Sequence, residues 1–120
     1  MFRKTLFEAF QHQVHSRPDA TALLLDSPQN TACKCSWHAL AVVVKHAADR
    51  IENQLARDAA LYRRVTHLSD NSDADLVIAL ASLALGTTEA PLDRRIETTE
   101  LLRRRKQISG AWIDDNFKRQ

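Results

Sequence analysis

The sequence is poor in glycine, proline and cysteine, and each shortage limits what the chain can be. Its 120 residues include two glycines, three prolines and two cysteines. A phosphate-binding loop needs several glycines close together, so two separated glycines argue against such a loop. Two cysteines supply neither a disulfide framework nor the four ligands of a structural zinc site.

The chain also lacks a long apolar run, a leader segment and a strong charge of one sign. Its longest uncharged apolar stretch, Leu76–Leu85, is far shorter than the roughly 20 residues that cross a bilayer. Glu8, Gln11 and His12 interrupt the apolar positions that a signal peptide would need. A formal net charge of +2 is too small to indicate a nucleic-acid or membrane partner. We therefore expect a soluble, cytoplasmic protein.

The chain does contain enough apolar residues for one core. It is 44% hydrophobic over 120 residues, and this length is typical of one domain. The sequence has no internal repeat, low-complexity tract or linker. We expect a single α/β domain that spans residues 1–120.

Helical spacing of apolar residues predicts two helices in the first half of the chain. The first begins with the capping-box pattern Thr5–Glu8 and ends before Pro18. The second begins after a cap at Ser36. Their expected apolar faces consist of Leu6, Phe7, Phe10 and Val14 in the first helix, and of Trp37, Leu40, Val44, Ala47, Ile51 and Leu55 in the second.

Two further helices are predicted in the second half. Leu76–Leu85 is apolar nearly all round, so we expect it to be buried on most sides, with Ser72 and Asp75 as a capping pattern. Gly86 lies where the glycine at a helix C-terminus belongs. The last helix is expected from Thr98 or Thr99 through Gln107, with Gly110 beyond it.

Short apolar runs between the helices predict strands. The expected strands are Ala20–Leu25, Ala32–Ser36, Tyr62–Leu68, Glu89–Leu92 and Ala111–Ile113. Polar residues bound Ala20–Leu25 on both sides, so this run indicates a buried strand. Strands that alternate with helices predict a three-layer α/β/α fold with a mostly parallel sheet.

The stretch Gly86-Thr87-Thr88, followed by Arg94 and Arg95, has the residue types of a phosphate loop. However, it follows a helix and precedes a strand, which is the reverse of the order that phosphate binding requires. The C-terminus of a helix also carries the negative end of its dipole. We therefore expect a joint between a helix and a strand here rather than a phosphate site.

Two pairs of residues could in principle bind a metal ion. His12 and His15 lie three positions apart on a helix, but the sequence places no third ligand beside them, so we expect surface histidines. Cys33 and Cys35 form a C-x-C pair on a predicted strand. We expect their side chains on opposite faces of that strand and expect both thiols to be reduced and structural.

The run Arg103-Arg104-Arg105-Lys106, together with Arg94-Arg95, is the best argument for a nucleic-acid module. Successive helical residues point about 100° apart, so these four cations cannot form one flat basic stripe. Nearby acidic residues also dilute the charge, and we expect a solvated helix surface instead.

Four segments occur in an order that resembles one known family. They are TLFEAFQHQVHSRPDATALLL, CSWHALAVVVKHAADRI, RVTHLSDNSDADLVIALASLALGTTEAPLD and TTELLRRRKQISGAWI. Each segment is similar to one part of the AMP-forming adenylating superfamily. The first resembles the family's first helix, R-P-D-x-x-A turn and first strand, and the second resembles its T-Y-x-E-L helix. The third resembles a strand, N-S turn, buried helix and P-L-D, and the fourth resembles the next helix and strand. This family contains acyl-CoA synthetases, adenylation domains of nonribosomal peptide synthetases, and luciferases. The resemblance covers about residues 5–113.

The resemblance implies a parent enzyme that activates a carboxylic acid with ATP and Mg²⁺ and then commonly forms a thioester with CoA. The family's phosphate loop, nucleotide contacts and catalytic lysine lie beyond the matched region. No catalytic, cofactor-binding or metal-binding residue can therefore be carried over to this chain. One departure is LARDAALYRR, which lacks the family's G-x-x-x-G-D turn before a strand.

We therefore interpret the chain as the N-terminal scaffold segment of an AMP-dependent acid ligase, catalytically silent alone. Its expected partners are the remainder of the parent enzyme and a second copy, bound through exposed sheet edges. One alternative is a stand-alone binding module that kept the fold and lost catalysis. The other is a weakly basic nucleic-acid-binding module.

Overall fold

The fold is a series of alternating helices and strands in a computed structural model that describes residues 5–26, 32–58, 63–69, 72–108, 110–114 and 117. The elements are α1 (Leu6–Ser16), β1 (Thr21–Asp26), β2 (Ala32–Ser36), α2 (Trp37–Arg57), β3 (Arg64–Ser69), α3 (Asp73–Leu85), β4 (Thr88–Asp93), α4 (Thr98–Ile108) and β5 (Ala111–Ile113). Each predicted helix and strand therefore has a counterpart. Tyr62, the first residue of one predicted strand, lies outside the described residues.

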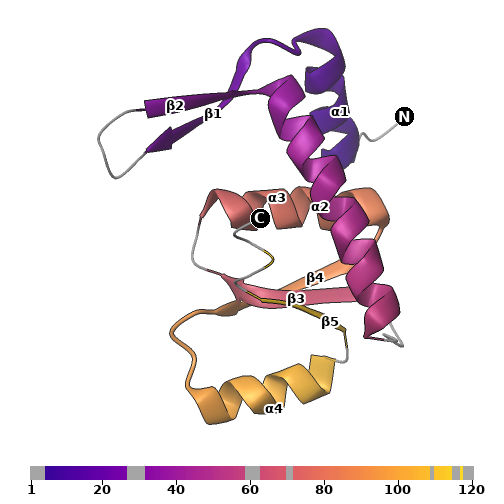
Figure 1. Ribbon diagram of the computed structural model, residues 1–120, viewed down its shortest axis with the longest axis vertical. Helices are drawn as coiled ribbons and strands as arrows, with labels where there is room; N and C mark the ends of the chain where they lie inside the picture. Colours follow the sequence, from indigo (N-terminus) through magenta and orange to yellow (C-terminus); the bar gives the residue numbers. More distant parts are fainter. Residues whose placement is uncertain are drawn as a thin grey trace.

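A parallel sheet of strand order β4-β3-β5 forms the middle layer of the molecule. Helices α2 and α3 lie on one face of this sheet and α4 lies on the other (Figure 1). The chain runs from β3 outward to β4 and then returns past β3 to β5, so its two connecting helices cover opposite faces. The predicted three-layer α/β/α fold with a mostly parallel sheet is confirmed.

Strands β1 and β2 form a separate antiparallel ribbon that is not part of the parallel sheet. The ribbon extends away from the helices, as Figure 1 shows. Leu24 on β1 is 67% exposed. The prediction that Ala20–Leu25 is a buried strand is therefore wrong, because only part of the ribbon, including Ala22 and Leu23, packs against the core while the rest extends beyond it.

Side-chain caps start the first two helices as predicted. The Glu8 amide donates to Thr5 Oγ1 at 3.1 Å, and the Thr5 amide donates to Glu8 Oε2 at 3.4 Å, which completes the capping box. Ser36 Oγ accepts from the Ala39 amide at 3.1 Å at the start of α2. These bonds satisfy amides that have no partner within the helix.

The predicted cap of α3 differs in its detail. Ser72 occupies the N-cap position, but its side chain makes no capping hydrogen bond. Asp75 does not close a capping box either, since its Oδ2 accepts from Ser69 Oγ at 2.9 Å. The carboxylate of Asp75 thus joins α3 to the end of β3.

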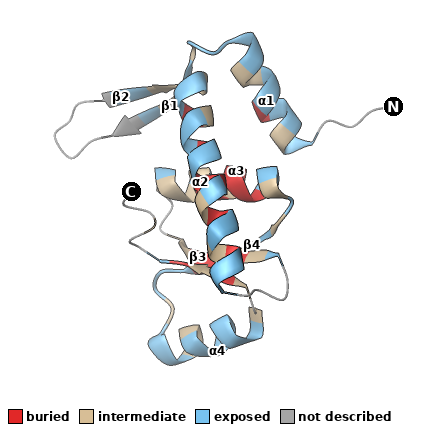
Figure 2. Cartoon of the chain, turned by 45° about the vertical axis from the view of Figure 1, so that its right-hand side comes forward, coloured by how far each residue is buried: buried red, intermediate tan, exposed pale blue. Residues whose placement is uncertain are grey.

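The hydrophobic core lies between α2, α3 and β3 (Figure 2). Ile51 of α2, Val65 of β3 and Ile78 of α3 are each at most 2% exposed. Helix α3 is less enclosed than predicted, because Leu76 and Leu83 are 39% and 42% exposed. These two leucines share a helix side that the described elements cover only in part, since residues seven apart point in nearly the same direction.

Helices α1 and α4 are also more exposed to solvent than their sequences indicate. Leu6 of α1 is 69% exposed, although it was expected on the apolar face with Phe10. Helix α4 begins at Thr98 and has no buried residue. Leu102 on this helix is 52% exposed, so α4 covers its face of the sheet only thinly.

The two glycines serve different purposes. Gly86 ends α3 with a φ of +67°, a left-handed conformation that favours glycine, and a Cβ there would meet nothing within 4 Å. Gly110 precedes β5, where a Cβ would lie 2.6 Å from Arg64 O and 2.8 Å from Arg64 Cβ. The closeness of Gly110 to the backbone of β3 was not predicted from the sequence.

Alanine at each glycine should therefore destabilise the fold for a different reason. We expect Gly86→Ala to cost about 1 kcal/mol through backbone strain. We expect Gly110→Ala to cost more, about 2–3 kcal/mol, because β5 must move away from β3. Urea unfolding monitored by circular dichroism measures both values, and an equal or smaller cost for Gly110→Ala would contradict the close approach.

Candidate functional site

The Gly-Thr-Thr stretch is a joint between α3 and β4, as predicted. The Gly86 amide donates to Leu83 O, and the Thr87 amide donates to Ser82 O. The Thr88 amide donates to Arg63 O and begins the pairing of β4 with β3. All three amides are used within the protein, so none remains to bind a phosphate.

The two histidines of α1 are exposed. His12 Nε2 lies 3.4 Å from Ser16 Oγ on the same helix. Among the residues that the structure describes, no group of three histidine, cysteine, aspartate or glutamate side chains could hold a metal ion. His12 and His15 are surface histidines.

The two cysteines lie on β2 as free thiols, Cys33 exposed and Cys35 partly buried. Our expectation that their side chains point to opposite faces was wrong, because residues two apart on a strand share one face. Cys35 faces Leu23 of β1 and packs at the edge of the core. Cys35 therefore contributes to packing in this structure.

The basic run on α4 separates into two pairs. Arg103 and Arg104 both bind Glu100, with Arg104 Nε 2.9 Å from Glu100 Oε1. Arg105 and Lys106 form no ion pair with any residue in the described part of the chain. The four cations thus form no single basic stripe, as expected from the sequence, and two of them remain without a carboxylate partner in the described part of the chain.

Hydrogen bonds from the arginines hold nearby carboxylates in their charged form. The guanidinium groups of Arg103 and then Arg104 lower the pKa of Glu100 to about 2. In the same way, Arg95 lowers the pKa of Asp93 to about 2 through side-chain and backbone hydrogen bonds. Both pairs are exposed to solvent, which screens them.

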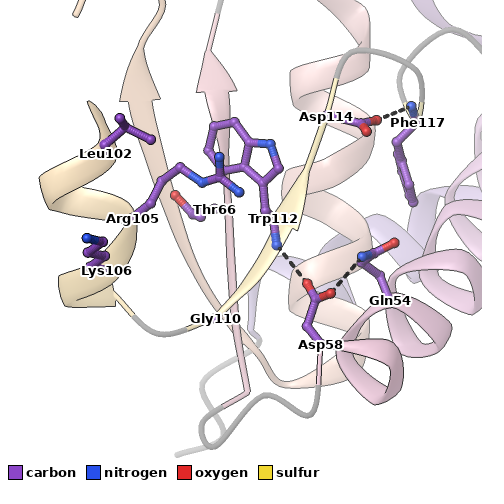
Figure 3. Close-up of a pocket in the computed structure, with 10 residues that line it drawn as sticks. All are labelled: Gln54, Asp58, Thr66, Leu102, Arg105, Lys106, Gly110, Trp112, Asp114 and Phe117. Atoms are coloured by element: carbon purple, nitrogen blue, oxygen red, sulfur yellow. Dashed lines mark hydrogen bonds between the residues drawn. The ribbon is translucent and has the colours of Figure 1, made fainter. Parts of the chain in front are cut away.

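The two unpaired cations line a cavity of about 570 Å³ between α4, β5 and the C-terminal end of α2 (Figure 3). The guanidinium carbon of Arg105 lies 4.0 Å from the centre of a Trp112 ring. This contact is a cation–π interaction and orients both side chains. The lining residues are Gln54, Asp58, Thr66, Leu102, Arg105, Lys106, Gly110, Trp112, Asp114 and Phe117.

The wall opposite α4 is acidic, but its carboxylates already accept hydrogen bonds. Asp58 accepts from Gln54 Nε2 at 3.0 Å and from the Trp112 amide at 3.3 Å (Figure 3). Asp114 accepts from the Phe117 amide at 2.9 Å. The Trp112 amide belongs to the outer strand β5, so Asp58 also satisfies a donor at the edge of the sheet.

A second polar cluster lies on the opposite face of the sheet, around a buried histidine. His67 of β3 is 1% exposed, and its Nε2 lies 2.8 Å from Glu89 Oε2 on β4. Its Nδ1 lies 3.6 Å from Asp75 Oδ1 on α3. One hydrogen shared between His67 Nε2 and Glu89 Oε2 therefore links β3 to β4.

This cluster ties the two strands to the helix above them. Thr66, the residue before His67, points to the other face and donates to Ala90 O at 2.7 Å. Because His67 is almost completely buried, it offers no surface to a solute in this structure. We therefore assign it a structural role. Sequence reasoning missed His67 because Glu89 lies 22 positions away along the chain. It missed the cavity residue Trp112 because the contact with Arg105 depends on how the chain turns between α4 and β5.

Comparison with known proteins supports the fold alone. No family model matches the sequence, and no curated protein matches it. The solved structure of IdnL1 aligns with 95% of this chain and 23% of its own chain at 22% identity, with a TM-score of 0.73. The structure of CmiS6 aligns with 95% of this chain and 29% of its own at 18% identity, with a TM-score of 0.71. The chain thus spans about a quarter of the length of these two proteins.

Removing the buried histidine should destabilise the protein, because Glu89 loses the hydrogen bond that joins it to His67. We expect His67→Leu to lower the free energy of unfolding by about 2–3 kcal/mol. The double variant His67→Leu/Glu89→Leu should cost less than the sum of the single variants, with a coupling of about 1 kcal/mol or more. Urea unfolding of all four proteins measures the coupling, and additive effects would show that the two side chains act independently.

The Glu100 pair predicts a change in α4 on acidification. Glu100 has a lowered pKa of about 2 against an ordinary value of 4.5, so its stabilising contribution is present above pH 4.5 and lost as the pH falls toward 2. The protection factors of the amides of residues 98–108, which are corrected for the intrinsic pH dependence of exchange, should therefore decrease over this range. In Glu100→Gln this pH dependence should be weaker, whereas Glu97→Gln should behave as the parent protein does. Equal profiles for all three proteins would disprove the assignment.

Proposed function

We propose that this chain is the N-terminal scaffold segment of an AMP-dependent acid ligase. The parent enzyme uses ATP to convert a carboxylic acid to its acyl-adenylate and then forms a thioester with CoA. The segment supplies α/β framework and is silent alone. The observation that carries this proposal is that 95% of the chain aligns with about a quarter of two longer proteins.

The ordered resemblance of four sequence segments gives the proposal its chemistry. These segments fall on α1 with β1, on α2, on β3 with α3 and β4, and on α4 with β5, in the order expected for the family. Gly86 ends a helix and Pro91 lies on the following strand, where the resemblance expects them. This agreement extends over the length of the matched region.

The surface of the chain supports a scaffold role. Leu76 and Leu83 of α3 and Val42 and Val43 of α2 are 39–57% exposed. Helix α4 buries none of its residues. Large apolar side chains that are exposed to solvent in an isolated segment are expected to be buried when the segment belongs to a larger protein.

The proposal also explains why nucleotide chemistry is not expected from the chain alone. Its Gly-Thr-Thr amides bond within the protein, and its buried histidine is closed to solutes. In the proposed parent enzyme, ATP, Mg²⁺ and CoA bind to parts that follow the matched region. No described helix is long and apolar enough to cross a membrane.

A tagged chromosomal gene tests this function. An affinity tag placed before Met1 allows the native product to be purified, sized and assayed for exchange of pyrophosphate into ATP with a panel of carboxylic acids. We expect a polypeptide or tight complex several times larger than 13.6 kDa that catalyses exchange with at least one acid. The recombinant 120-residue chain is the matched control and should bind no ATP and show no exchange.

Two outcomes would overturn the proposal. A native product of 13.6 kDa without a tightly bound partner and without exchange would favour the stand-alone binding module. Exchange by the isolated 120-residue chain would instead mean that this segment carries the nucleotide site itself.

A further inference from the structure

We propose that the cavity beneath α4 binds a small organic anion that carries a flat apolar group. The cavity holds about 570 Å³, which is within the usual range of roughly 300–1,000 Å³ for small-molecule sites. Its walls combine the apolar side chains of Leu102, Trp112 and Phe117 with two cations from α4. This proposal does not rest on the adenylating function.

The charges of the cavity differ in how far they are already satisfied. Asp58 and Asp114 on one wall each accept hydrogen bonds from the protein. Arg105 and Lys106 on the other wall donate to no carboxylate in the part of the chain described here. The free binding capacity of the cavity is therefore cationic, and a negatively charged group is the ligand that fits it.

The two neighbouring arginines show that this arrangement is specific to part of the basic run. Glu100 binds Arg103 and Arg104. The next two residues, Arg105 and Lys106, line the cavity instead (Figure 3). Arg105 and Lys106 line the cavity together with Leu102 of the same helix, whereas Arg103 and Arg104 do not line it.

The contact with Trp112 holds the Arg105 guanidinium in place before an anion binds. With its guanidinium carbon 4.0 Å from the ring centre, Arg105 lies against the indole and loses little freedom when an anion binds. Lys106 lines the same cavity and adds a second positive charge on a flexible stem. The exposed side of the guanidinium and the side chain of Leu102 can contact a flat apolar group next to the anion.

Nuclear magnetic resonance with three probes tests the site. Benzoate and phenyl phosphate carry the expected chemistry with two different anions, and benzyl alcohol is the neutral control. We expect saturable shifts of the Trp112 indole N–H and of the amides of residues 102–106 with at least one anion. Binding of benzyl alcohol should be about tenfold weaker or undetectable.

Matched variants locate the charge that matters. Arg105→Gln and Lys106→Gln should each weaken anion binding about fivefold or more. Arg103→Gln removes the same charge from the same helix outside the cavity, and it should leave the affinity within about twofold. The amide spectrum shows whether each variant remains folded.

Several results would overturn the proposal. They are an absence of saturable shifts at millimolar probe, equal binding of benzyl alcohol, or an equal loss in Arg103→Gln. Binding of a short oligothymidylate that exceeds both small anions and depends equally on Arg103 would indicate a nucleic-acid surface rather than a small-molecule site. A preference between benzoate and phenyl phosphate would identify the anion.

Discussion

The arrangement of this protein depends on the central strand β3, which is buried on both faces and paired along both edges. Val65, Thr66 and His67 follow one another and are each at most 2% exposed. Val65 contributes to the apolar core, but the next two side chains are polar and must find partners without water. Thr66 bonds to Ala90 O and His67 Nε2 bonds to Glu89, so the register of β4 beside β3 gives each side chain a partner, while His67 Nδ1 has no hydrogen-bond partner among the described residues.

The two faces of the sheet are covered unequally, and the consequences follow from this difference. On one face, α2 and α3 exclude water from Ile51, Ile78 and the His67 cluster. On the other face, α4 buries none of its residues and leaves room for a cavity beside β5. The well-covered face provides stability, whereas the thinly covered face provides the accessible polar chemistry.

Both edges of the parallel sheet carry features that limit the addition of another strand. The Thr88 amide points to β3, so Pro91 lies at an outward position of β4 where it has no N–H to offer. On the other edge, the Trp112 amide of β5 already donates to Asp58 and is not free to pair with another strand. Self-association through sheet edges stays a prediction, and these residues are the ones that it would have to overcome.

The sequence by itself determined the order of the elements, because caps, turn residues and apolar spacing act over a few positions. Thr5 with Glu8, Ser36 and Gly86 each mark a helix end through contacts with near neighbours. The separation of β1 and β2 from the main sheet was not predictable, because the apolar pattern of a strand does not determine which other strand it pairs with. The exposure of Leu76 and Leu83 likewise depends on which elements cover α3.

Only the tertiary structure decided which polar residues act together. His67 and Glu89 are 22 positions apart and meet because parallel pairing places β4 beside β3. Asp58 and Trp112 are 54 positions apart and meet because β5 lies beside the C-terminal end of α2. Local patterns therefore determine where helices and strands begin and end. Pairs distant in the sequence depend on register and layer packing, which are set by the burial of the whole chain.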